Sequence, residues 1–253
     1  YYISREKAED ITDMYIHQVN CCGDAPSDSC GVYIGIPFCP TRCLYCSFAS
    51  NQVDPCEYER YLDALVKEIE YCGEKLKEAG IYPETVYIGG GTPTSLSERQ
   101  LDMLLCQVFE SFDFSRLKEF TVEAGRPDTI TRDKLKILKK YNISRISINP
   151  QTMNDDTLSL IGRSHSVQEI RDAFAMAREE GFDNINMDII AGLPEETQGD
   201  FERTLKEIGV MSPESVTVHC LAVKRASKLI DIDRNYHYRQ GEVTQTRADG
   251  IAR

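Results

Sequence analysis

Residues 32–46 read VYIGIPFCPTRCLYC and place Cys39, Cys43 and Cys46 directly after an apolar run. The apolar, β-branched start of this stretch is typical of a buried strand. The spacing C-x3-C-x2-C lets the thiolates of one short loop converge on one point. Cysteine thiolates hold iron–sulfur clusters, and a cubane with only three of them leaves one iron open to a small chelating ligand.

A zinc site and disulfide bonds are the two other interpretations of these cysteines. A structural zinc site needs further cysteine or histidine ligands close by, and the nearest histidines are His17 and His165. Disulfide frameworks are typical of small secreted domains, whereas this is a long acidic chain without a signal peptide. We therefore favour an open iron–sulfur site over zinc or a disulfide.

Six strand-like runs alternate with helix-like segments, which predicts a parallel α/β sheet with right-handed crossovers. Six units are too few for a closed eight-stranded barrel. A partial barrel and a doubly wound sheet share this periodicity, so the spacing leaves both open. We expect strands over about 31–37, 85–88, 119–123, 145–148, 185–190 and 215–220. We expect helices over about 5–20, 55–79, 97–108, 131–140, 154–161, 166–180 and 198–209.

The first helix after the cysteines carries clear boundary signals. Asp54 and Glu57 match a capping box, and Gly80 suits the position just past the helix end. The predicted buried stripe comprises Tyr58, Leu62, Leu65, Ile69, Cys72, Leu76 and Ala79. Cysteines in helical patterns are expected to be packing residues, namely Cys56, Cys72 and Cys106.

Polar residues and glycines gather where the predicted strands end. Gly89–Gly91 follows the second strand, Glu123 ends the third, Gln151 follows the fourth and Asp188 lies on the fifth. Parallel α/β proteins bind ligands at the carboxyl ends of their strands, and glycine lets a backbone approach a ligand closely. Structural roles as a loop cap, a turn residue or an acceptor for backbone amides remain the alternatives.

The cysteine motif resembles the signature of the radical S-adenosylmethionine (SAM) superfamily. Further stretches resemble the oxygen-independent coproporphyrinogen III dehydrogenase (oxidase) family: YIGIPFC at 33–39, GGGTPT at 89–94 and DIIAGLP at 188–194. CPTRCLYCSF at 39–48 and VEAGRPD at 122–128 are most similar to its HemZ-like branch. The resemblance covers about residues 31–225 and implies a partial (β/α)6 TIM-like barrel, the radical SAM core.

The resemblance also implies the cofactors and their ligands. Cys39, Cys43 and Cys46 match the ligands of a [4Fe–4S] cluster whose open iron binds SAM. Tyr33, Gly90 and Glu123 match contacts of this SAM. Contacts of a possible second SAM match Tyr45, Gly91, Thr92, Gln151, Arg163, Asp188 and Ala222. No catalytic side chain beyond this cofactor site is implied.

The implied activity is one-electron cleavage of SAM, followed by oxidative decarboxylation of coproporphyrinogen III propionates to vinyl groups in haem biosynthesis. The implied partners are a tetrapyrrole substrate and an electron donor such as flavodoxin or ferredoxin. The chain departs from well-characterised dehydrogenases of the family by having Gly35 in place of a histidine and Phe48 in place of a cysteine. A haem-binding chaperone and a radical methyltransferase acting on a tetrapyrrole therefore remain alternatives.

Composition limits the cellular setting and partners of the chain. Its 253 residues carry a formal net charge of −12, which disfavours nucleic acid and anionic membranes as partners. We expect no membrane span and, because free thiols suit a reducing compartment, a cytoplasmic location. We expect a helix and loop over 1–30, the barrel over 31–223, and a tail over 224–253 that starts a further segment of a longer chain.

Overall fold

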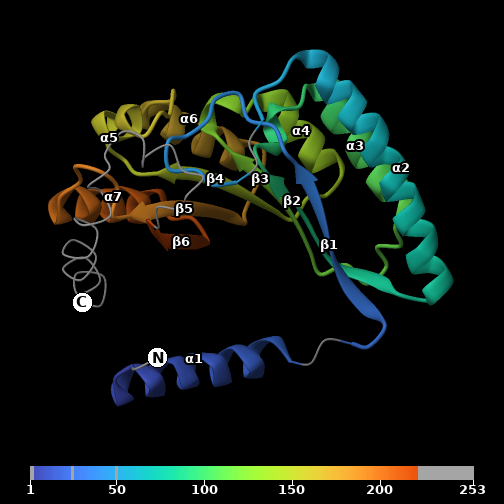
Figure 1. Ribbon diagram of the computed structural model, residues 1–253, viewed down its shortest axis with the longest axis horizontal. Coiled ribbons are helices and arrows are strands. Elements are labelled where there is room, and N and C mark those ends of the chain that lie inside the picture. Colours follow the sequence, from blue (N-terminus) through green and yellow to red (C-terminus); the bar gives the residue numbers. More distant parts are fainter. Residues whose placement is uncertain (1–2, 24–25, 49–50, 222–253) are drawn as a thin grey trace.

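The computed structural model describes residues 3–23, 26–48 and 51–221, and their strands form a curled sheet (Figure 1). Its six strands are all parallel and lie in chain order. Among the described strands the order never reverses, whereas a doubly wound sheet has a reversal point. The partial barrel is thus confirmed. The strands are β1 Ser29–Ile36, β2 Tyr82–Gly90, β3 Glu119–Gly125, β4 Arg145–Gln151, β5 Ile185–Ala191 and β6 Ser215–Cys220.

Helices connect each strand to the next and cover the outer face of the sheet (Figure 1). They are α2 Pro55–Ala79, α3 Glu98–Ser111, α4 Arg132–Lys140, α5 Asp155–Leu160, α6 Val167–Glu179 and α7 Gln198–Met211. The predicted N-terminal helix is present as α1 Arg5–Cys22 and lies apart from these helices, with Met14 and Tyr15 exposed. Within the described part of the chain, no helix is long and apolar enough to cross a membrane.

Alternation along the strands gives the sheet two different faces. Successive strand residues point to opposite faces, and the helix-covered face is apolar and fully buried. Its residues include Ile34, Ile36, Val86, Ile88, Phe120, Val122, Ile146, Ile148, Ile185, Met187 and Ile189. The concave face instead carries polar and aromatic side chains: Tyr33, Tyr87, Glu123, Ser147, Asn186, Asp188 and Thr217. The concave face is therefore the one suited to polar ligands.

The predicted boundaries of α2 are confirmed, whereas the capping box predicted at its start is not. The helix ends at Gly80, whose φ of 66° is left-handed, and capping boxes begin α3 and α6. The capping box predicted for Asp54 and Glu57 is wrong, because the Asp54 side chain accepts no capping hydrogen bond. The Glu57 carboxylate instead pairs with Arg60 at 2.7 Å.

The predicted buried stripe of α2 is wrong at Ala79, the last residue of the helix, which is exposed. It is also wrong at Cys72, which is exposed. Its neighbour Gly73 is buried, because α2 and α3 cross there so closely that a Cβ would lie 2.3 Å from the Ser111 carbonyl oxygen. Cys56 and Cys106 are exposed as well, so the packing role expected for these cysteines is also wrong.

Candidate cofactor site

The cysteine loop begins beside the glycine segment that follows β2. The register pairs Ile36 at the end of β1 with Gly90 at the end of β2. Beyond the strands, Gly91 donates its N–H to the Ile36 carbonyl and Thr92 donates to the Phe38 carbonyl, both at 2.7 Å. The glycine segment therefore continues the β1–β2 pairing and fixes where the cysteine loop starts.

Backbone hydrogen bonds hold the loop at two further points. Cys39 donates its N–H to the Asn51 carbonyl at 3.2 Å, and Asn51 donates to the Pro37 carbonyl at 2.8 Å. On the other side, the Leu44 N–H reaches the Ile161 carbonyl after α5 at 3.0 Å. The loop is thus anchored both to its own base and to the segment between α5 and α6.

The three thiols are half-buried and free. Burial raises the pKa of Cys39 and Cys46, and the charge of the neighbouring Cys43 thiol acts in the same direction. Metal binding requires thiolates, so loading of this loop is expected to release protons.

Three thiols on one short loop are a donor set that a [4Fe–4S] cubane can use. In the part of the chain that the structure describes, no three His, Cys, Asp or Glu side chains lie close enough to share one metal ion. A cubane takes each thiolate on a different iron, so its three cysteines stand further apart than the ligands of one ion.

Gly90 and Gly91 show why the last residue of β2 and the residue after it are glycines. Gly90 has a φ of +111°, a conformation that side chains rarely permit. A Cβ on Gly91 would lie 2.4 Å from the Phe38 carbonyl oxygen. The close approach to a ligand predicted from these glycines stays a prediction, and the close approach that the structure shows is to the backbone of the cysteine loop.

Glu123 lies at the end of β3 in a cradle of aromatic rings. Tyr87 donates its hydroxyl hydrogen to Glu123 Oε1 at 2.5 Å, and its ring stacks on Tyr33 with centroids 5.8 Å apart. Burial raises the pKa of Glu123, which the hydrogen bond from Tyr87 partly offsets. The carboxylate is therefore held in place beside an exposed Tyr33 ring.

Arg163, Tyr45 and Gln151 gather at the end of β4. Arg163 is buried, donates to the Asn149 carbonyl at 2.7 Å and to the Tyr45 hydroxyl at 3.1 Å. Gln151 is buried with a φ of 70°. Among the described residues, Arg163 Nε and Asn149 Oδ1 are buried without a hydrogen-bond partner. Such unpaired buried groups are costly, so a polar ligand at this place would be stabilising.

Asp188 lies on the concave face of β5. Asn186 donates to it at 2.7 Å, and His219 Nε2 lies 4.0 Å from its carboxylate. Asn186 is in turn fixed by Ser147, to which it donates at 2.8 Å. A polar network across the strands thus orients this carboxylate.

The structure brings the predicted residues to one edge and the concave face, in two groups. Cys39, Cys43, Cys46, Tyr33, Gly90, Gly91, Thr92 and Glu123 lie on the side of β1 to β3. Tyr45, Gln151, Arg163 and Asp188 lie on the side of β4 and β5. Ala222 lies outside the described residues. Their contacts with a cluster or SAM stay predictions.

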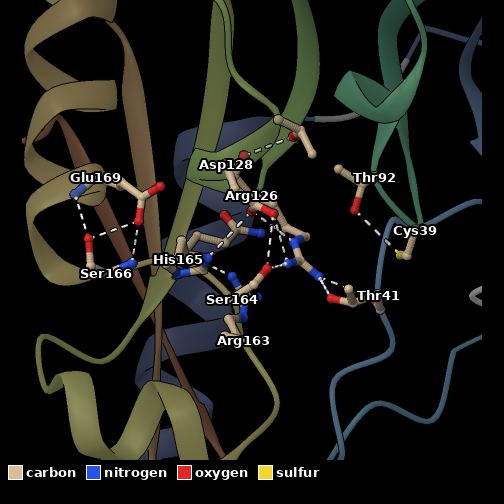
Figure 2. A network of polar contacts seen from close by, with 12 residues as sticks. Cys39, Thr41, Thr92, Arg126, Asp128, Arg163, Ser164, His165, Ser166 and Glu169 are labelled. Carbon is tan, nitrogen blue, oxygen red and sulfur yellow. Dashed lines mark hydrogen bonds and ion pairs between the residues drawn. The ribbon is translucent and has the colours of Figure 1, made fainter.

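Two residues of the site were not predicted from the sequence. Tyr87 lies on the concave face of β2, and the alternation of side chains along the strand could have placed it there. Arg126 stands in the quoted stretch 122–128, but a charge after a strand end gives no hint of its partners. It connects the cysteine loop to the segment after α5 (Figure 2).

The chain is similar in sequence to known proteins of one superfamily. The sequence matches the model of the Radical SAM superfamily over residues 33–208. It is 44% identical, over 100% of this chain and 52% of the relative, to the "Oxygen-independent coproporphyrinogen-III oxidase-like protein HemZ" of Bacillus subtilis. It is 39% identical, over 76% of this chain and 50% of the relative, to the "Heme chaperone HemW" of the same organism.

A solved structure shows the same architecture. Coproporphyrinogen III oxidase (HemN) from Escherichia coli, described as a radical SAM enzyme, matches with a TM-score of 0.72 and 28% identity. The match covers 87% of this chain and 54% of that chain. The chain spans about half the length of the curated relatives it matches.

Proposed function

The chain belongs to the radical SAM superfamily, and on that premise we propose that it oxidatively decarboxylates the propionates of coproporphyrinogen III. The observation that carries the cofactor part is one edge of the sheet that holds three half-buried thiols, the Gly90–Thr92 segment and the cradled Glu123. The substrate part is supported by the relative named as coproporphyrinogen-III oxidase-like at 44% identity.

The residues present fit the cofactors of this family. Cys39, Cys43 and Cys46 would hold three irons of a [4Fe–4S] cluster, and Glu123 would accept a hydrogen bond from the ammonium of SAM. When bound, the cluster and SAM supply one-electron chemistry that removes a hydrogen atom from a substrate carbon. We propose that the electron comes from a donor protein of the flavodoxin or ferredoxin class and that the chain works in the reducing cytoplasm, which its free thiols support.

The chain's own residues would orient a second polar ligand as well. Arg163 Nε and Asn149 Oδ1 offer one free donor and one free acceptor within the described residues. Asp188 offers a carboxylate that suits ribose hydroxyls. We therefore propose a second SAM, bound by Tyr45, Gly91, Thr92, Gln151, Arg163, Asp188 and Ala222.

A haem-delivery role is the second candidate. It is favoured by the relative named heme chaperone at 39% identity. It is also favoured by Gly35 and Phe48, which replace a histidine and a cysteine of the dehydrogenases, and Phe48 is 70% exposed. An exposed aromatic ring beside the cysteine loop is suited to stack on a flat apolar ligand.

A product assay separates the two candidates. The anaerobically reconstituted protein is incubated with SAM, dithionite and coproporphyrinogen III. We expect protoporphyrinogen and 5′-deoxyadenosine, with omission of SAM as the control. Stoichiometric haem binding without a vinyl product would favour delivery, and a methylated tetrapyrrole would show a methyltransferase. Either result would overturn decarboxylation.

A further inference from the structure

Arg126 is a buried cation at the centre of a polar network that the proposed function does not use. It follows β3, and only 3% of it is exposed. Its guanidinium pairs in two-pronged fashion with Asp128, through Nε at 3.0 Å and Nη2 at 2.9 Å. Nη2 also donates to Ser164 Oγ at 2.8 Å, and Nη1 donates to Thr41, to its hydroxyl and to its carbonyl at 3.2 Å (Figure 2).

These contacts join three segments that are distant in sequence. Thr41 lies in the cysteine loop, Asp128 follows β3, and Ser164 lies between α5 and α6. The same segment after α5 already holds the far side of the loop, because the Leu44 N–H bonds to Ile161. Arg126 therefore links Thr41, which precedes Cys43, to the same segment after α5 that holds Leu44, which follows Cys43.

A buried ion pair gives little net stability, since desolvation offsets the Coulomb attraction. Burial acts to raise the pKa of Asp128, but the neighbouring His165 and Arg126 together hold it below its ordinary value, so the pair is charged. An apolar pair would serve packing as well. An apolar pair would supply neither the planar guanidinium that donates to Thr41 nor a fixed positive charge beside the thiols.

We propose that Arg126 is a positioning residue of the cysteine loop, which sets the loop's conformation through Thr41 and raises the reduction potential of the cluster through its charge. This inference rests on the proposed cluster. Thr41 lies two residues from both Cys39 and Cys43. Arg126 Nη1 donates to Thr41, which stands between these two cysteines in the sequence, so the cation lies against the loop that carries the thiols. A fixed cation favours the more negative, reduced state of a cluster.

The conformational part is tested without metal. Hydrogen exchange of the peptide covering residues 39–46 is measured in the apo chain. We expect exchange about tenfold faster in Arg126→Gln, Arg126→Lys and Thr41→Val, because each loses hydrogen bonds to the loop. Arg132→Gln is the control: this exposed arginine pairs only with Glu179 and Glu180 among the described contacts. Unchanged exchange in Thr41→Val and both Arg126 variants would overturn the assignment.

The electrostatic part is tested on the reconstituted chain by dithionite titration of the cluster with mediator dyes. We expect a more negative potential in Arg126→Gln and a potential near wild type in Arg126→Lys, which keeps the charge. Release of iron to a chelator should be about 10- to 100-fold faster in both. A purely structural arginine would move the melting temperature without separating these two variants.

Two further measurements keep the outcomes distinct. If Arg126→Gln does not fold, the double variant Arg126→Met, Asp128→Leu replaces the ion pair by an apolar one, and its loop should still exchange faster; wild-type exchange there would overturn the assignment. A wild-type chain that holds no cluster would overturn the proposed function. Hydrogen exchange of the cysteine loop in the apo chain would still decide whether Arg126 positions the loop.

Discussion

At the residue scale, Glu123 shows how burial and hydrogen bonding set the charge of the site. Its carboxylate is half-buried and accepts a hydrogen bond from Tyr87 at 2.5 Å. Burial raises its pKa above the ordinary 4.5. With the folded pKa above the unfolded one, its contribution to stability is present below about pH 4.5 and is lost as the pH rises through the folded pKa.

Glu123→Gln should therefore stabilise the apo chain and weaken binding of SAM. At pH 7 the variant buries no charge, so we expect a melting temperature higher by about 1–3 °C, and no gain near pH 4. Calorimetry should show SAM binding to the reconstituted variant weakened about tenfold or more. The exposed Glu70→Gln is the matched control, and a lower melting temperature at pH 7 in Glu123→Gln would contradict the argument.

The cysteines give a second prediction at this scale. Cys39→Ala, Cys43→Ala and Cys46→Ala should each prevent anaerobic reconstitution of about four irons per chain, because each removes one thiolate ligand. Cys72→Ala, at an exposed position on α2, should bind iron like wild type. Iron and sulfide analysis with electron paramagnetic resonance checks this. A stable zinc site in the reconstituted protein would contradict the cluster.

Single residues also show what the sequence could and could not predict. Cys39, Glu123 and Asp188 were predicted because local spacing and strand ends place them. Arg126 was not, because its role depends on contacts with Thr41 and Ser164, 85 and 38 residues away in sequence. Cys72 was wrongly predicted to be buried. Helical periodicity does not show that α2 packs against α3 through the next residue, Gly73.

At the scale of elements, the strand ends and their loops form one joined unit. The glycine segment pairs with the start of the cysteine loop through Gly91 and Thr92. Tyr61 on α2 donates to the Gly35 carbonyl at 2.6 Å, so the helix after the loop supports β1 as well. The loop conformation is thus set by β2 and α2 together, which the order of elements predicted only in outline.

Gly91→Ala should break this unit. The added Cβ would lie 2.4 Å from the Phe38 carbonyl oxygen and push the cysteine loop away from β2. We expect a loss of about 2 kcal/mol or more in the free energy of unfolding, and loss of iron binding. Denaturant titration and iron analysis measure both.

Gly209→Ala is the control for this substitution. A Cβ at this helical position on α7 would meet open space, so we expect stabilisation by about 0.5–1 kcal/mol. If Gly91→Ala matched it in stability and iron content, the close approach would have no role in holding the loop.

At the scale of the whole molecule, the core and the site occupy different sides of the sheet. The main apolar cluster lies between the helix-covered face and α2 to α7, and Phe38 is its member nearest the cysteines. The polar groups lie on the concave face and the carboxyl edge. The main apolar core is therefore separate from the cysteine thiols and from the polar groups of the concave face.

This separation predicts that the chain folds without a cluster. The apo form prepared in air should unfold in one cooperative thermal transition, because burial of the helix-covered face supplies the stability. Anaerobic loading should raise the melting temperature, since a ligand that binds only the folded state stabilises it. Cys43→Ala is the control: it should melt like the apo wild type and show no rise on loading. Circular dichroism at increasing temperature measures all three samples. An apo form without a cooperative transition would mean that the cluster is part of the fold, and that the barrel is not a preformed scaffold for it.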